Sequence, residues 1–286
     1  MPVRVTYIEA DGIPTRCYTA GSGYPLLLVH GIGASTDSWL RVVDPLGEHF
    51  QVVAPDLIGH GFTGIGDFAG GPPHPHVVRH LLAVADAAGF DRFSICGSSY
   101  GALLTLLCYF ERPERIDRLI LLSSASSTMP DAQRLESFSH AYKVAVGTMA
   151  EPSIEHVRQR MEGLVYDPAT VPPELLLMQA NVYARPGLRQ GFEAIMKGMM
   201  DLEACRPWDV HGRFGEVACP LLMLWGLEDP RADSGRAKEL AAQAREAYFV
   251  GLSDCAHVPH IEQPGQVVSL IARFLEGESL AEYKVG

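Results

Sequence analysis

Short, continuously apolar runs recur along this chain, and stretches with the apolar spacing of helices separate them. Continuous apolarity over five or six residues predicts strands that are buried on both faces, as in a parallel sheet. The predicted strands are 25–30, 50–55, 92–96, 118–123, 220–225 and 247–251. The predicted helices span about 38–49, 75–89, 100–111, 234–244 and 264–276. This alternation predicts an α/β fold with a mostly parallel central sheet and helices on both of its faces.

The N-terminal region follows a different pattern. Residues 3–9 and 14–20 alternate apolar and polar side chains, which is the period of a strand with one exposed face. They flank Asp11-Gly12, and an Asp-Gly pair between two such runs is a strong hairpin signal. We therefore expect an antiparallel pair of strands at one edge of the sheet.

The alternation of strands and helices stops between residues 126 and 209, where the apolar spacing is helical throughout. We interpret this segment as a helical cap inserted into a core formed by residues 1–125 and 210–286. Seven of the nine methionines lie in the cap, where they suit the roof of an apolar pocket and ordinary packing equally well. An acidic chain with such an insertion is also compatible with a homodimer.

Charge narrows the classes of partner. The 286 residues hold 23 Lys and Arg against 34 Asp and Glu, a net charge of −11. Nucleic acids and anionic membrane surfaces are bound through clustered positive charge, so we expect neither as a partner. The six cysteines are scattered, the N-terminus lacks the apolar stretch of a signal peptide, and no run approaches the length of a membrane span. These features predict a cytoplasmic protein with free thiols.

A candidate nucleophile lies where the predicted strand 92–96 gives way to the predicted helix 100–111. The sequence Gly97-Ser-Ser-Tyr-Gly101 matches the pattern G-x-S-x-G, in which the serine stands on a sharp turn from strand to helix. The two glycines let the strand and the helix cross closely, and the helix start directs free backbone N–H groups at the reacting centre. We expect Ser99 to be the nucleophile. The alternatives are a helix-capping role for Ser99 and attack by Ser98.

A loop rich in glycine, His30-Gly-Ile-Gly33, follows the first buried strand. Attack on a carbonyl builds negative charge on its oxygen, and preorganised N–H groups stabilise that charge. We expect the backbone N–H groups of Tyr100 and Ile32 to be these donors, with Gly33 as the alternative to Ile32. His30 precedes the serine in the chain, which does not suit a base in such a fold, so we expect it to order the loop. With Gly31 it would border the substrate.

The base and its orienting acid follow the last two predicted strands. A serine needs an imidazole to take its proton and a carboxylate to hold the imidazole, in the chain order Ser, acid, His. Asp229 is the expected acid, with Glu228 as the alternative, and His257 is the expected base, with His260 as the alternative. We expect no metal at the two histidines, because Pro259 argues against a helix that would place both on one face.

Cofactor chemistry is not expected. No G-x-G-x-x-G follows a predicted strand, and the chain has no G-x-x-x-x-G-K-[ST] loop. The sequence therefore predicts chemistry by side chains alone, acting on a small molecule.

Jointly these segments resemble the serine hydrolases of the α/β-hydrolase superfamily. The resemblance covers most of the chain outside the cap and rests on five segments: His30-Gly-Ile-Gly33, Pro55-Asp-Leu-Ile-Gly-His-Gly61, Gly97-Ser-Ser-Tyr-Gly101, Trp225-Gly-Leu-Glu-Asp229 and His257-Val-Pro-His-Ile-Glu262. It implies the α/β-hydrolase fold and a cofactor-independent Ser-His-Asp triad that acts on a small, largely apolar carbonyl substrate.

Within the superfamily the chain is similar to the meta-cleavage product hydrolases, which cut C–C bonds in ring-fission products of aromatic compound degradation. It also resembles carboxylesterases and enol-lactonases, so the resemblance implies an ester or an activated C–C bond as substrate. An enol-lactonase, a cofactor-free haloperoxidase-like enzyme, and a receptor or scaffold protein without activity are the alternatives.

The chain departs from the C–C hydrolases at four positions. Those enzymes have Asn before and Met after the nucleophile, Gly after the motif and Trp after the catalytic histidine. The corresponding residues here are Ser98, Tyr100, Ala102 and Val258. The resemblance also implies a cap arginine that binds the dienoate end of the substrate. Arg185 is our choice for it and Arg189 the alternative, while a solvated role is as compatible with the sequence.

Overall fold

Within residues 2–66, 68, 70–231 and 233–285, which the computed structural model describes, eight strands form one sheet in the order β1-β2-β4-β3-β5-β6-β7-β8. Only the pairs β1–β2 and β2–β4 are antiparallel, so the predicted antiparallel edge is confirmed. The strands are β1 (Arg4–Ala10), β2 (Ile13–Ala20), β3 (Pro25–Val29), β4 (Gln51–Pro55), β5 (Phe93–Ser98), β6 (Ile116–Leu122), β7 (Leu221–Gly226) and β8 (Ala247–Leu252).

The central strands are buried on both faces, as their continuous apolarity predicts. In β3, Leu27 and Val29 pack into one hydrophobic core and Leu26 and Leu28 into a second, and all four are fully buried. Successive side chains of a strand point to opposite faces, so each strand supplies both cores.

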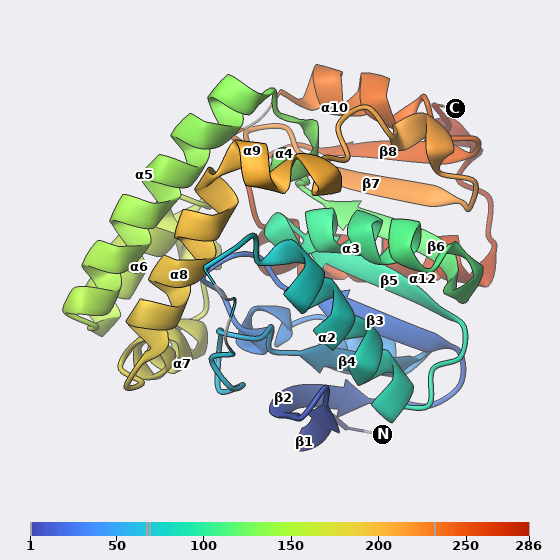
Figure 1. The fold of residues 1–286 in the computed structure, drawn as a ribbon. Helices are drawn as coiled ribbons and strands as arrows, with labels where there is room; N and C mark the ends of the chain where they lie inside the picture. The colour runs from blue at the N-terminus through green and yellow to red at the C-terminus, as the bar shows by residue number, and fades with distance from the viewer. Residues whose placement is uncertain (1, 67, 69, 232, 286) are drawn as a thin grey trace.

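Helices cover both faces of the sheet (Figure 1). Buried residues of α2, α3 and α10 belong to one core and those of α1 and α12 to the other. The α-helices are α1 (Val43–Gly47), α2 (His74–Ala87), α3 (Tyr100–Glu111), α4 (Ala125–Thr128), α5 (Asp131–Ala150), α6 (Ile154–Glu162), α7 (Pro173–Tyr183), α8 (Leu188–Met200), α9 (Leu202–Cys205), α10 (Ser234–Ala241), α11 (Pro259–Glu262) and α12 (Pro264–Glu276).

Two local predictions have different outcomes. The hairpin at Asp11-Gly12 is confirmed: Ala10 pairs with Ile13, and both turn residues have positive φ, 51° and 73°, as a type I′ turn requires. The single helix predicted at 38–49 is wrong, because a short 3₁₀ turn at Thr36–Trp39 and α1 replace it. Pro45 explains the break, since its ring would clash with a helical carbonyl four residues earlier.

The segment between β6 and β7 is helical, and α5 to α8 lie together beside one end of the sheet (Figure 1). Helix α4, however, lies across the predicted boundary at residue 126 and packs against α3 and α10. Helix α5, which starts at residue 131, is the first helix of this segment to lie beside the end of the sheet. The division into a core and a cap remains a prediction.

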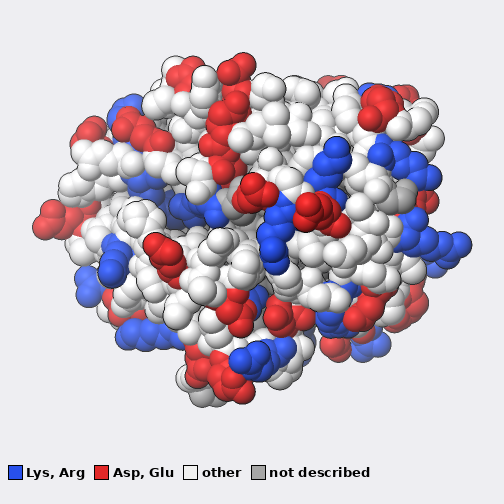
Figure 2. Space-filling view, turned by 90° about the horizontal axis from the view of Figure 1, so that it is seen from above, with Lys and Arg blue, Asp and Glu red and all other residues white. Residues whose placement is uncertain are grey.

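The surface, the thiols and the helices add three observations. On the face shown in Figure 2, acidic and basic side chains are interspersed rather than gathered by sign. All six cysteines are free, and burial raises the pKa of the fully buried Cys96 thiol. Among the described residues, no helix combines the length and the apolarity needed to cross a membrane.

Candidate active site

Ser99 stands between β5, which ends at Ser98, and α3, which begins at Tyr100. Its backbone has φ 55° and ψ −116°, a conformation that side-chain-bearing residues rarely adopt. The flanking glycines permit this turn. A Cβ added at Gly97 would lie 2.2 Å from the carbonyl oxygen of Gly101, and one at Gly101 would lie 2.2 Å from that of Val29. The close crossing expected from the two glycines is therefore confirmed.

Three residues from distant parts of the chain meet at this turn. The Ser99 hydroxyl lies 2.9 Å from His257 Nε2, and His257 Nδ1 lies 2.8 Å from Asp229 Oδ2. With Nδ1 donating to the carboxylate, Nε2 is free to accept the serine proton. Asp229 follows β7 and His257 follows β8, so all three lie at the carboxyl ends of parallel strands.

Asp229 is held as a carboxylate. Burial opposes its ionisation, but the neighbouring His257 and the backbone N–H of Arg231, 2.9 Å from Oδ1, more than offset that effect and lower its pKa below the usual range. Glu228, the alternative acid, is exposed, and its Oε2 accepts from the N–H of Cys255. Glu228 therefore steadies the loop that carries His257.

Glu262 is a buried residue of the same loop region for which the sequence suggested no role. Its carboxylate accepts from the N–H groups of Ala256 at 3.0 Å and Val258 at 3.2 Å, on either side of His257. It also accepts from the N–H of Tyr166 in the segment between β6 and β7, at 2.7 Å. Glu262 thus fixes the backbone that presents the imidazole.

His260, the alternative base, does not reach the serine. Its ring is buried against Trp39, with 4.2 Å between ring centroids, and burial lowers its pKa to about 3. As expected, no helix carries both histidines: α11 begins at Pro259, where proline is well tolerated as a first helical residue, and His257 lies before it. The described residues contain no group of three or more His, Cys, Asp and Glu arranged to hold a metal.

The loop after β3 touches the serine. His30 is fully buried, with Nδ1 donating to the Gly31 carbonyl at 2.8 Å and Nε2 accepting from the N–H of Leu57 at 2.9 Å. Burial lowers its pKa to about 4, so the ring is neutral and can make both bonds. A Cβ at Gly31 would lie 3.2 Å from that of Ser99. His30 therefore orders the loop from behind and, contrary to the expectation that it borders the substrate, does not line the cavity at Ser99, whereas Gly31 does.

The two alternatives for the oxyanion donor differ in their surroundings. Ile32 lines the cavity that contains Ser99. The carbonyl of Gly33 accepts from the Tyr183 hydroxyl at 2.7 Å, which ties this residue to α7. Tyr100 begins α3, where helix geometry leaves backbone N–H groups without an intrahelical partner.

The cavity at Ser99 has a volume of about 240 Å³. Side chains of α5 and α6 and of the loops after β3, β7 and β8 enclose it. Its described lining residues are Gly31, Ile32, Ser98, Ser99, His140, Ala141, Val144, Gln159, Arg160, Gly163, Leu164, Arg231, His257, Val258 and His260. None of these is a methionine, so the methionines do not roof this cavity, and Met149, Met161, Met196 and Met199 pack into the hydrophobic core.

Neither cap arginine proposed from the sequence lines this cavity. The guanidinium of Arg185 donates to the carbonyl oxygens of Gly61 and Thr63, and Arg189 pairs with Glu193 on its own helix. Arg160 and Arg231 line the cavity instead. Arg231 was open to prediction, since it stands two residues after Asp229 in one loop. Arg160 was not, because the apolar spacing of α6 shows which face meets the core but not which polar residue beside that face meets the cavity.

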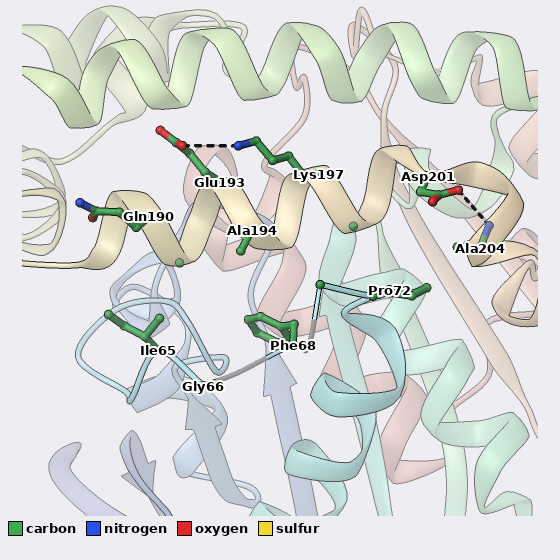
Figure 3. A pocket seen from close by; sticks show the side chains of 14 residues that line it. Ile65, Gly66, Phe68, Pro72, Gln190, Glu193, Ala194, Lys197, Asp201 and Ala204 are labelled. Carbon is green, nitrogen blue, oxygen red and sulfur yellow. Dashed lines mark hydrogen bonds and ion pairs between the residues drawn. The ribbon is translucent and has the colours of Figure 1, made fainter.

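A larger cavity, of about 610 Å³, lies between α8 and the loop that ends at Pro72 (Figure 3). Figure 3 shows Glu193 and Lys197 paired across one turn of α8, 3.9 Å apart. None of the described residues that line it is a candidate nucleophile, base or oxyanion donor. Chemistry, rather than volume, therefore identifies the cavity at Ser99 as the candidate site.

Known proteins resemble this chain over nearly its whole length. A 2-hydroxy-6-oxo-2,4-heptadienoate hydrolase of Pseudomonas putida is 28% identical over 289 aligned residues, covering 95% of this chain and 96% of the relative. A 2-hydroxymuconate semialdehyde hydrolase of a Pseudomonas species is 26% identical, covering 94% and 92%. The solved structure of a meta-cleavage product hydrolase from Pseudomonas fluorescens shares the fold with a TM-score of 0.79, at 24% identity, and covers 95% of this chain and 97% of its own.

The expected α/β-hydrolase fold is thus confirmed, and the chain is a hydrolase by its relatives and its fold. Residues 26–270 match the sequence family described as the alpha/beta hydrolase family. This chain belongs to the alpha/beta hydrolase family.

Proposed function

We propose that this hydrolase works through a Ser99–His257–Asp229 triad. The proposal rests on one observation, the chain of hydrogen bonds from the Ser99 hydroxyl through His257 to the buried Asp229 carboxylate. As Ser99 Oγ attacks a carbonyl carbon, His257 Nε2 takes its proton, and Asp229 stabilises the imidazolium that forms. His257 then returns the proton to the leaving group, and water releases the acyl group from Ser99.

The oxyanion of the intermediate would lie beside two backbone N–H groups. The N–H of Tyr100 at the start of α3 and the N–H of Ile32 in the loop after β3 are the donors that we assign. The loss of one such donor costs enzymes of this mechanism roughly 10² to 10³ in kcat. The loop hydrogen bonds of His30 support this assignment, since they hold the loop against the serine.

The substrate class that we favour is a small ring-fission product with a C–C bond next to a ketone. Support comes from the two curated relatives, whose names describe hydrolases of a heptadienoate and of a muconate semialdehyde. Such a substrate has to ketonise before attack, so that the departing carbon leaves as a stabilised carbanion. An ester or an enol-lactone needs only the acyl chemistry of the triad and is the alternative substrate.

A substrate panel tests this function. Short-chain esters, an enol-lactone and a 2-hydroxy-6-oxo-dienoate would be offered to the unaltered chain, Ser99→Ala and Ser98→Ala. We expect dienoate turnover with a loss of at least about 10³-fold in Ser99→Ala and less than about tenfold in Ser98→Ala. Unchanged turnover in Ser99→Ala refutes the mechanism. Turnover of esters or lactones alone refutes the C–C assignment, and no turnover of any substrate favours a receptor or scaffold role.

A further inference from the structure

Two arginines from different elements line the cavity at Ser99. Arg160 comes from α6, and Arg231 comes from the loop that also carries Asp229. Both are partly buried, and both line the cavity together with Ser99 and His257. Two cations thus border the place where a substrate of the proposed function would lie.

Neither guanidinium forms an ion pair with a described side chain, although Asp229 lies near enough to attract Arg231. Among the described residues, the side chains of Arg160 and Arg231 make no ion pair and no hydrogen bond, and only the backbone N–H of Arg231 binds Asp229. The guanidinium carbon of Arg160 lies 5.7 Å from the centroid of the Tyr183 ring. By contrast, Arg158, on the same helix and more exposed, pairs with Glu155 at 3.6 Å.

The two arginines also repel each other. Burial, together with the positive charge of Arg160, lowers the pKa of Arg231 to about 10 against the attraction of Asp229. Arg231 is still charged at neutral pH, so the folded chain holds two like charges near each other, and Asp229, the carboxylate that attracts Arg231, is hydrogen-bonded to His257 instead. An anion bound between them would relieve this repulsion and use the free N–H donors.

Carboxylate is the anion that fits these groups. A guanidinium presents five N–H donors in a planar fork that matches the two oxygens of a carboxylate. The polar side chains of Gln159 and His140 line the same cavity, while Ala141 and Val144 supply an apolar part. A volume of about 240 Å³ restricts the ligand to a small molecule.

We propose that Arg160 and Arg231 form an anion subsite that selects small substrates carrying a carboxylate in addition to the carbonyl attacked by Ser99. This inference rests on the proposed function and deepens it, because it names the feature by which substrates are chosen. The anion subsite would serve a substrate that is cleaved at an ester bond as well as one that is cleaved at a C–C bond. It moves the substrate-binding role from Arg185, which holds the loop at Gly61 and Thr63, to two other arginines.

The test is a binding experiment that does not depend on turnover. Calorimetry would measure the affinity of the Ser99→Ala chain for monomethyl succinate and for methyl 4-methylpentanoate, in which an isopropyl group replaces the carboxylate. We expect the anion to bind at least about tenfold more tightly. Adding Arg160→Gln or Arg231→Gln should each weaken anion binding by about 10- to 100-fold, the effect of losing a charged hydrogen bond.

Arg158→Gln is the matched control, since it removes an exposed charge from the same helix and should leave both affinities unchanged. Arg160→Lys and Arg231→Lys keep the charge without the fork and should retain part of the preference. Circular dichroism checks that each variant is folded. Equal affinity of the two probes, or an equal loss for both in the arginine variants, overturns the subsite. Anion-selective binding in a chain that turns over no substrate overturns the proposed function alone.

Discussion

The Nδ1 atom of His257 lies 2.8 Å from Oδ2 of Asp229, although the two residues are 28 positions apart in the chain. Their strands β8 and β7 are parallel neighbours, so the loops that follow both strands leave the same edge of the sheet side by side. The turn after β5 joins them there. Because the strands are parallel, side chains from three separate loops can form one series of hydrogen bonds.

Asp229→Asn should reduce kcat by about 10²- to 10⁴-fold with little change in stability. An amide cannot enforce the imidazole tautomer that accepts the serine proton, nor stabilise the imidazolium. Steady-state kinetics with the best substrate of the panel would measure the effect.

Glu228→Gln is the control for that variant. Its amide oxygen can still accept from the N–H of Cys255, so we expect kcat to stay within about twofold. Equal losses in the two variants would show that Asp229 acts on the loop rather than on His257.

Gly97→Ala should destabilise the fold by at least about 2–3 kcal/mol, because its Cβ would lie 2.2 Å from a backbone oxygen, well inside van der Waals contact. Gly147→Ala should change the stability in the opposite direction. Gly147 lies inside α5 with open space at its Cβ position, so the change should stabilise the chain by roughly 0.5–1 kcal/mol. Urea unfolding curves of the two variants would measure both changes in the free energy of unfolding. A Gly97→Ala chain as stable as the unaltered chain would contradict the close crossing of β5 and α3.

Arg16→Met should cost about 3–5 kcal/mol of folding free energy. The buried guanidinium of Arg16 binds Asp56 and Asp37, each at 2.7 Å, and its removal leaves two buried carboxylates without their cation. Arg79→Met removes an exposed pair with Asp11 and should cost less than about 1 kcal/mol. Similar losses for both variants in chemical denaturation would argue against the buried network.

Stability should fall as the pH drops from about 6.5 towards 4. Burial lowers the pKa values of His30, His74 and His80 to about 4, whereas an unfolded histidine titrates near 6.5. Between these values the unfolded chain binds more protons than the folded chain, so acid favours unfolding by up to about 1.4 kcal/mol per pH unit for each such histidine. Denaturation curves at pH 8, 6.5 and 5 would measure this, and a stability that is flat over this range would be contrary to the prediction.

The chain's own patterns determined most of the fold. Continuous apolar runs marked the buried strands, because a parallel sheet hides both faces of each strand. Asp11-Gly12 fixed the hairpin through local backbone geometry, and Gly97-Ser-Ser-Tyr-Gly101 marked the turn at Ser99 through the space that two glycines leave. These features depend on neighbours in sequence, and for that reason they could be predicted.

The surroundings of the site were decided by tertiary structure alone. Helical spacing shows that α6 has an apolar face, but which polar residue beside that face meets the cavity depends on how the helices pack. Arg160 therefore lies in the site, while Arg185, with the same chemistry, holds a loop elsewhere. Charge and residue type are properties of a sequence, whereas the pairing or isolation of a charge depends on contacts between segments far apart in the chain.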